Sequence, residues 1–346
     1  MTYPGVIELG ANQITPRPYR GGSGIARLRG IPHTDPYTPE DFVGSSVEVF
    51  GGGAGLTRLD DGTLLRDAQH ADPRGFFGEV MTDRDRAEPE VLVKLLSTDE
   101  RLFIHAHPDD AFARGHLNAV CGKTEAWIIV ATDTPEKEGA YVLLGFDRDV
   151  EATELTDWFE RQDVDAMAAA MHRLPVEVGD TVHVPAGVPH GIGPGITLVE
   201  LQQPTDLSIL LEYDGYQGLD RSSALLGLPR DVALGALRRD AVSASEISRW
   251  RSRRARSGRV ETLFPDISDP FYRASRVHPG SEAVTMPQGF AIVVTLEGSG
   301  ELEWQSGTAS ATAGRTFLVR HDAGPVRISP GLGLLWCRPP APRDAV

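Results

Sequence analysis

Short apolar runs that end at glycine or proline are the feature that most constrains this chain. Its 346 residues include 37 glycines and 25 prolines. Runs such as "VLVKLL" (91–96) and "SSVEVF" (45–50) have the length of β-strands and are separated by turn residues. The pattern predicts a mainly β fold, and the strand pattern returns from about residue 261 to the C-terminal region.

Two stretches depart from the strand pattern. In residues 154–174, Leu155, Trp158 and Phe159, and later Met167, Met171 and Leu174, recur at helical spacing. This predicts a helical insertion near 151–174. A second helical zone covers about 221–251 and runs into a basic stretch, Arg249–Arg259. We interpret that stretch as a solvated connection between domains, with a phosphate or subunit contact as the alternative.

Composition excludes several classes of protein. The formal net charge is −15, from 34 basic and 49 acidic residues, which argues against a nucleic-acid surface. No apolar stretch is long enough to span a bilayer, and the first residues do not resemble a secretion signal. Cys121 and Cys337 are too few for a disulfide framework. We therefore expect a cytoplasmic protein with no membrane or nucleic-acid partner.

The stretch "FIHAHPDD" places two histidines on one side of a strand. Alternate side chains of a strand share a face, so His105 and His107 point the same way, and Pro108 ends the pairing. Two neutral imidazoles on one face suit a metal ion. The alternative is that the two histidines merely pack.

Two further motifs favour the metal. Glu125 begins the apolar run "EAWIIV", and the stretch "GDTVHVPAGVPH" ends at His190 after a turn, which resembles the second metal motif of cupin barrels. His105, His107, Glu125 and His190 would hold one divalent ion and leave coordination positions open, as catalysis needs. A ligand set with three nitrogen atoms suits Fe, Co, Ni or Mn as well as zinc.

An internal similarity links the two ends of the chain. Residues 179–193 resemble residues 314–328, but the second copy lacks a histidine where His190 stands in the first. We predict a metal-bearing catalytic module over 1–215, with N-terminal strands. A helical and basic connection over 216–260 and a metal-free module over 261–346 would follow.

The motifs resemble a known family. "HPDD", "GKTE" and "PAGVPHGIGPG", in this order, resemble class I phosphomannose isomerase (mannose-6-phosphate isomerase) in its short bacterial form, a member of the cupin superfamily. The resemblance covers residues 91–206 well and the last module loosely. It implies two cupin (jelly-roll) barrels with helical insertions. It also implies a zinc-dependent interconversion of mannose 6-phosphate and fructose 6-phosphate through a cis-enediol.

Three positions depart from the family pattern. Phe103 stands where the family has a serine near the substrate phosphate, His105 where it has a glutamine ligand, and Leu210 where it has an arginine. Losing a hydroxyl and a guanidinium weakens recognition of an anion, whereas the metal chemistry is retained. Either Lys123 and an arginine elsewhere, from the helical zone, Arg221 or the basic stretch, supply the missing donors, or the sugar carries no phosphate.

Other residues that match the family pattern suggest roles in catalysis or substrate binding. Lys123 is a candidate catalytic and substrate-binding group that could hold an enediolate, or alternatively forms a salt bridge at the barrel rim. Asp206 is a candidate base, and Glu200 a candidate base or substrate-binding residue. The resemblance implies a small sugar or sugar phosphate as partner and leaves the oligomeric state open. The alternatives are an isomerase of an unphosphorylated sugar and a non-catalytic sugar-binding cupin.

Overall fold

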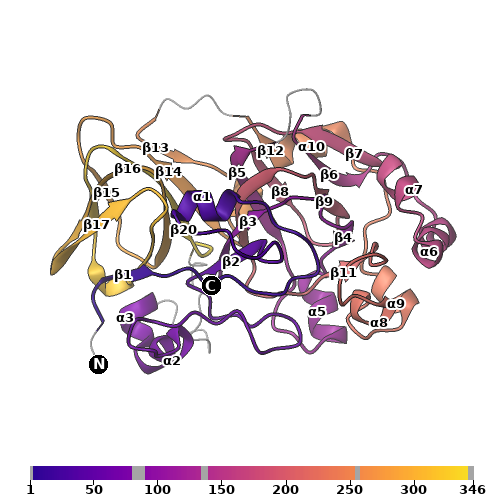
Figure 1. Ribbon diagram of the computed structural model, residues 1–346, viewed down its shortest axis with the longest axis horizontal. Helices are drawn as coiled ribbons and strands as arrows, with labels where there is room; N and C mark the ends of the chain where they lie inside the picture. The colour runs from indigo at the N-terminus through magenta and orange to yellow at the C-terminus, as the bar shows by residue number, and fades with distance from the viewer. Residues whose placement is uncertain (1–2, 80–89, 134–138, 254–257, 342–346) are drawn as a thin grey trace.

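A computed structural model describes residues 3–79, 90–133, 139–253 and 258–341. Within these ranges the strands form three antiparallel sheets, so the prediction of a mainly β fold is confirmed. The C-terminal sheet lies at one end of the molecule, and helices α6 to α9 lie at the other (Figure 1). No helix in the described ranges is long and apolar enough to cross a membrane.

A six-stranded sheet forms the middle layer. Its order is β12-β8-β5-β10-β3-β2. The strands are β2 (Glu40–Val43), β3 (Leu92–Ser97), β5 (Glu125–Thr132), β8 (Thr181–Val184), β10 (Ile196–Gln202) and β12 (Arg251–Ser252). The inner strands β3, β5 and β10 are buried on both faces over most of their length, which explains why they are mostly apolar in sequence.

A five-stranded sheet packs on one face of the middle layer, in the order β11-β4-β9-β6-β7. Its strands are β4 (His105–Ala106), β6 (Tyr141–Phe146), β7 (Met171–Pro175), β9 (His190–Ile192) and β11 (Ile209–Leu210). Trp127 and Leu198 of the middle sheet share one hydrophobic cluster with Val142 and Leu144 of this sheet. The candidate site lies between these two sheets.

The C-terminal sheet packs on the other face of the middle layer, where Ile128 and Val199 meet Val294 and Leu335. Its strands are β1 (Val6–Leu9), β13 (Val260–Thr262), β14 (Arg273–Val277), β15 (Val284–Met286), β16 (Ala291–Trp304), β17 (Gly307–Thr312), β18 (Thr316–Val319), β19 (Val326–Ile328) and β20 (Leu332–Arg338). The first strand of the chain, β1, pairs with β18 and so belongs to this last sheet. Apart from this strand, the division into segments 1–215, 216–260 and 261–346 stays a prediction.

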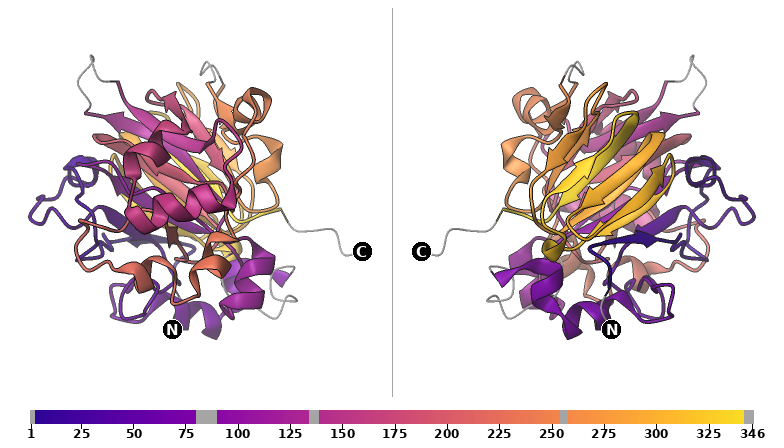
Figure 2. Two further views of the ribbon diagram at one scale, coloured as in Figure 1. Left: turned by 90° about the vertical axis from the view of Figure 1, so that its right-hand side faces the viewer. Right: turned by 90° about the vertical axis from the view of Figure 1, so that its left-hand side faces the viewer.

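Helices α6 and α7 cover the outside of the five-stranded sheet, α2, α3 and α5 lie along the lower edge in Figure 1, and α1 and α10 contact strands of the middle sheet. Leu155 and Phe159 of α6 and Met167 of α7 pack on Leu143 and Phe146 of β6, and the left view of Figure 2 shows these helices in front of the strands. The helices are α1 (Gly24–Arg29), α2 (Leu65–Ala71), α3 (Pro73–Phe77), α5 (Asp110–His116), α6 (Ala152–Arg161), α7 (Val164–Ala169), α8 (Arg221–Ala224), α9 (Arg230–Leu234) and α10 (Ala244–Trp250).

Two local predictions from sequence were wrong. The run at 45–50 is not a strand, because Gly44 before it and Gly51 after it adopt positive φ values of 59° and 94° and turn the chain away from the sheet. Met171 and Leu174 belong to strand β7 and not to the predicted helix. Met171 pairs with Phe146 and Leu174 with Val142 of β6, so strand pairing prevails over the helical spacing.

Candidate metal centre and active site

Three buried histidines meet between the two facing sheets. His105 in β4 pairs directly with His190 in β9, and His107 follows immediately after β4. The ring centroid of His105 lies 4.1 Å from that of His190 and 4.9 Å from that of His107. One nitrogen from each ring lies within 4.8 Å of the other two, which is close enough for the three rings to share a metal ion.

The backbone orients each of these rings. Nδ1 of His105 lies 2.9 Å from the carbonyl oxygen of Phe103, and Nδ1 of His190 lies 2.8 Å from that of Val188. Nδ1 of His107 lies 2.8 Å from the carbonyl oxygen of Leu207. A carbonyl only accepts hydrogen bonds, so each Nδ1 carries a proton, and Nε2 is the nitrogen left on each ring to bind a metal ion. Metal-binding histidines are commonly oriented in this way.

Glu125, at the start of β5, faces the histidines from the middle sheet. Its Oε2 lies 3.0 Å from Nε2 of His107 and its Oε1 lies 3.3 Å from Nε2 of His190. Neither Nε2 atom nor Oε2 forms a hydrogen bond of acceptable geometry to any described residue. Lone pairs of nitrogen and oxygen therefore face one another in a buried space. A divalent cation between them removes this repulsion, so the residues fit a metal ion.

Electrostatics keeps these groups in the forms that bind metal. Burial, and then the positive charge of Lys123, lowers the pKa of His107 to about 3. Burial, and then the neighbouring His190 and His107, holds the pKa of His105 well below its ordinary value. Burial opposes ionisation of Glu125, but Lys123 and His107 outweigh it and its pKa lies well below the usual range. The imidazoles of His105 and His107 are therefore neutral, and the carboxylate of Glu125 is charged.

Lys123 and Glu200 lie beside this centre. Nζ of Lys123 is 3.0 Å from Oε2 of Glu125. Burial lowers the pKa of Lys123, but the charges of Glu125 and Glu200 outweigh it, so that the pKa is raised and the amine stays protonated. Glu200 in β10 accepts a hydrogen bond from the indole N–H of Trp127 at 3.2 Å. Burial, and then the charge of Glu125, raises the pKa of Glu200 to about 7.

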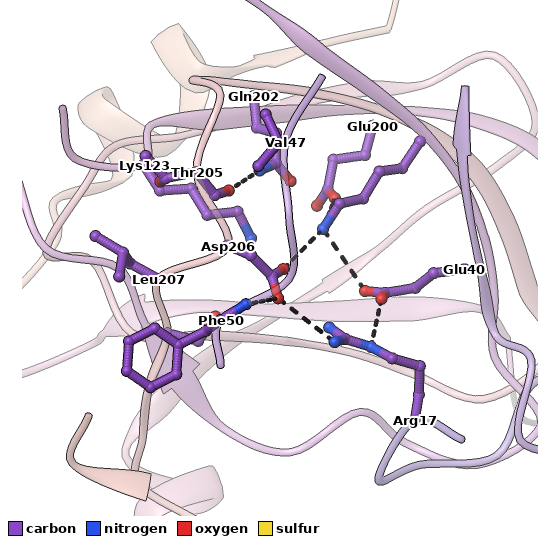
Figure 3. Close-up of polar contacts among 12 residues, drawn as sticks. Arg17, Glu40, Val47, Phe50, Lys123, Glu200, Gln202, Thr205, Asp206 and Leu207 are labelled. Atoms are coloured by element: carbon purple, nitrogen blue, oxygen red, sulfur yellow. Dashed lines mark hydrogen bonds and ion pairs between the residues drawn. The ribbon is translucent and has the colours of Figure 1, made fainter. Parts of the chain in front are cut away.

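A network of ion pairs adjoins the centre (Figure 3). Asp206 accepts hydrogen bonds from Nζ of Lys94 at 3.3 Å, Nη1 of Arg17 at 3.4 Å and the backbone N–H of Phe50 at 3.2 Å. Nε of Arg17 also lies 2.6 Å from Oε2 of Glu40. Burial opposes ionisation of Asp206, but Arg17 and Lys94 outweigh it, and its pKa lies well below the usual range.

One pocket collects residues from both sheets and from the N-terminal segment. The predicted residues Phe103, His105, Lys123, Glu125, Glu200 and Asp206 line it, as do Arg17, Tyr19, Glu40, Leu96, Leu102, Ile192 and Ser208. Leu210 pairs with His105 across the ladder, and its side chain packs in the hydrophobic cluster between the sheets. The position where the family has an arginine is thus apolar and buried here.

The arginine that reaches the pocket is Arg17, which the sequence analysis missed. Arg221 binds Glu160 on the surface, and Arg251 and Arg259 pair with Asp180 and Glu282. Residues 254–257 of the basic stretch lie outside the described residues. Arg17 lies in "TPRPYRGG", which has no periodicity or ligand spacing, so no local signal could have identified it.

Three known proteins that are similar in sequence to this chain all carry mannose-6-phosphate isomerase names. Mannose-6-phosphate isomerase ManA of Bacillus subtilis is 34% identical over 142 residues, and mannose-6-phosphate isomerase of Streptococcus mutans is 31% identical over 160 residues. The matches span 41% and 46% of these relatives, less than half of their length. A further B. subtilis protein with a mannose-6-phosphate isomerase name is 27% identical over 71% of this chain and 72% of its own length. No family model matches the chain.

Solved structures share the fold. The crystal structure of mannose 6-phosphate isomerase from B. subtilis superposes with a TM-score of 0.74 at 23% identity, covering 96% of this chain and 99% of that one. A variant of phosphomannose isomerase from Salmonella typhimurium gives a TM-score of 0.73 at 14% identity, over 97% and 100% of the two chains. The arrangement of sheets described above is therefore common to these proteins.

Proposed function

The chain belongs to the phosphomannose isomerase family, and on that premise we propose that it is a metal-dependent aldose–ketose isomerase. The proposed reaction is the interconversion of mannose 6-phosphate and fructose 6-phosphate through a cis-enediol. One observation carries the proposal. The buried Nε2 atoms of His107 and His190 and Oε2 of Glu125 face one space without a hydrogen bond of acceptable geometry, next to the ring of His105 and beside a carboxyl group whose pKa is raised to about 7.

His105, His107, His190 and Glu125 would hold one divalent ion. The family favours zinc, and a site with three nitrogen ligands also suits Fe, Co, Ni or Mn. Such an ion supplies a Lewis acid for the oxygen atoms on C1 and C2 of the sugar.

Glu200 is the residue to which we assign the proton transfer. A general base works best when its pKa is near the working pH, because it then both accepts and returns a proton. Before an ion binds, burial and the charge of Glu125 raise the pKa of Glu200 to about 7, and a divalent ion on Glu125 would lower it from there. Its carboxyl oxygens would take the proton from C2 of the aldose and return it to C1.

Lys123 and Asp206 suit other roles. Lys123 stays charged, because Glu125 and Glu200 raise its pKa, so it is placed to stabilise negative charge on an enediolate oxygen. Asp206 was a candidate base from sequence. Its lone pairs accept from Arg17, Lys94 and the N–H of Phe50, so it is a poor base, and we assign it the role of positioning the two cations.

The test is an assay of metal-loaded protein with mannose 6-phosphate and fructose 6-phosphate, compared with its Glu200→Gln variant. We expect kcat to fall about 10²- to 10⁴-fold in the variant, the usual contribution of a general acid–base group, while metal content stays the same. A metal-loaded wild-type protein that isomerises no sugar would instead support a non-catalytic sugar-binding protein.

One observation favours a second candidate, an isomerase of an unphosphorylated sugar. Each cation lining the pocket or adjoining it already contacts a carboxylate, namely Arg17 with Glu40, Lys94 with Asp206, and Lys123 with Glu125. Phe103 lines the pocket and has no hydroxyl group that could donate to a phosphate. Comparing kcat/KM for mannose 6-phosphate and mannose separates the candidates, since each tenfold preference corresponds to about 1.4 kcal/mol of transition-state binding.

A further inference from the structure

Buried polar atoms without a hydrogen-bond partner gather around the pocket. Among the described residues, three such atoms belong to His107, His190 and Glu125, and a bound ion accounts for them. Three more belong to residues that line the pocket from the N-terminal segment and β2: the hydroxyl oxygen of Tyr19, and Nε of Arg17 and Oε2 of Glu40, which form an ion pair with each other but no hydrogen bond of acceptable geometry. An ion held by the histidines does not account for this second group.

The hydroxyl of Tyr19 is the most informative of these atoms. The side chain is 1% exposed, and its ring packs edge-on against Phe103, with ring centroids 5.6 Å apart. Phe103 in turn packs edge-on against His105, with centroids 5.2 Å apart. Tyr19 therefore lies one aromatic ring away from a metal ligand. Burying a hydroxyl without a partner costs free energy, which a ligand in the pocket could recover.

Arg17 and Glu40 offer complementary groups next to this hydroxyl. Nε of Arg17 and Oε2 of Glu40 are only 2.6 Å apart, yet neither atom forms a hydrogen bond of acceptable geometry. After burial, the charge of Glu40 and a contact of the hydroxyl with its carboxylate raise the pKa of Tyr19 well above the ordinary value, although the two side chains form no hydrogen bond of full geometry. The tyrosine hydroxyl is therefore neutral and can donate.

We propose that Tyr19, together with Arg17 and Glu40, forms a subsite that binds sugar hydroxyl groups away from the metal. A sugar hydroxyl both donates and accepts, so it can donate to the Glu40 carboxylate while it accepts from Tyr19 or Arg17. A phosphate only accepts at neutral pH and would be repelled by Glu40, so the subsite suits hydroxyls. The inference rests on the proposed function only in taking the ligand to be a sugar.

Tyr19 and Tyr216 both pack against Phe103, and this allows a matched test. The ring of Tyr216 also packs edge-on against Phe103, at 5.3 Å, but its hydroxyl donates to the carbonyl of Arg101 at 3.1 Å. We expect Tyr19→Phe to weaken binding of fructose 6-phosphate and of free fructose by the same factor, about 3- to 10-fold, without lowering Tm. Tyr216→Phe should lower Tm and leave both affinities unchanged.

Calorimetric titration of the metal-loaded proteins measures the affinities, and thermal unfolding without sugar measures Tm. An unchanged affinity in Tyr19→Phe, or a loss confined to the phosphorylated sugar, would overturn the subsite even if the wild-type protein is an active isomerase. So would binding of neither sugar by the wild-type protein. Conversely, if the wild-type protein binds sugar but isomerises none, a weaker Tyr19→Phe supports the subsite while the proposed reaction fails.

Discussion

The turn that follows β8 and the turn that follows β18 have similar sequences but differ in whether protein atoms satisfy their polar side chains. The first carries Pro185, Gly187 and His190, and directs an imidazole with an unpaired Nε2 toward two other histidines. The second places Arg320 where the first has Pro185, and its guanidinium binds Asp322, Asp72 and the carbonyl of Tyr3. The first turn keeps a polar atom unsatisfied, whereas the second uses its polar atoms to join segments of the chain.

The difference shows that two turns of similar sequence can serve different purposes. In the second turn Arg320 is 2% exposed and also packs over the ring of Phe76, so it ties α3 and the N-terminal segment to the last sheet. Within the described residues the cluster of His105, His107 and His190 is the only group that could hold a metal. Protein atoms complete the polar contacts of the second turn, whereas the first turn contributes to a group of side chains that could hold a metal ion.

The largest effect should come from removing a histidine of the first turn. We expect His190→Ala to lose the bound metal, and isomerase activity to fall about a thousandfold or more, because the ion supplies several kcal/mol of charge stabilisation. His107→Ala should behave in the same way. Elemental analysis should give about one divalent ion per wild-type chain and none in these variants.

Two variants make this comparison sharper. His321→Ala removes a histidine from the second turn and should leave metal content and activity unchanged. His105→Gln should retain the metal, because glutamine occupies this position in the family that the sequence resembles. A metal-free His105→Gln protein together with a metal-loaded His190→Ala protein would contradict the assigned ligands.

A smaller effect concerns pH and the contact between β8 and the last module. His183 in β8 lies 2.9 Å from the hydroxyl of Ser268 and 3.2 Å from that of Tyr272. Burial lowers its pKa to about 4. In the unfolded chain histidine binds a proton below about pH 6.5, so the unfolded state gains protons first as the pH falls. The stability contributed by this neutral histidine is therefore lost between about pH 6.5 and pH 4.

His183→Asn keeps an acceptor near the position of Nδ1 but cannot take up a proton. We expect its free energy of unfolding to fall less than that of the wild-type protein between pH 7 and pH 4, by up to about 3 kcal/mol. Urea unfolding at several pH values measures the difference, and taking the difference between the two proteins cancels the titration of the other histidines. Parallel pH profiles would show that His183 does not carry this dependence.

The smallest effect should come from the second turn. Arg320→Met removes a buried guanidinium but leaves Asp72 and Asp322, which are about half exposed and can be hydrated. We expect a loss of about 2 kcal/mol in the free energy of unfolding, below the range for a fully buried pair. Metal content and activity should stay unchanged.

Arg327→Met is the matched control for this change. Arg327 pairs with Glu303 on the surface of the same sheet, and such pairs contribute at most about 1 kcal/mol. Urea unfolding compares the two variants. An equal loss in both, or a loss of metal in Arg320→Met, would remove the distinction between a structural turn and a functional one.

The sequence by itself was sufficient for features encoded over a few residues. A mainly β fold follows from short apolar runs between glycine and proline, and the structure confirms it. The histidine spacing at 105 and 107 and the turn before His190 predicted a group that the structure brings within metal-binding distance. Alternation along a strand and the reach of a tight turn are local properties, so spacing alone is informative there.

Only the tertiary structure decided what surrounds that group. Arg17 and Tyr19 come from an irregular segment, Glu40 begins the short strand β2, and Lys94 lies within the apolar run of β3, yet all four converge around Asp206 and Glu200. Their positions depend on how the N-terminal segment packs across the middle sheet, which no periodicity records. The pKa of Glu200 likewise depends on burial and on its distance from Glu125, and both arise only when the two sheets pack together.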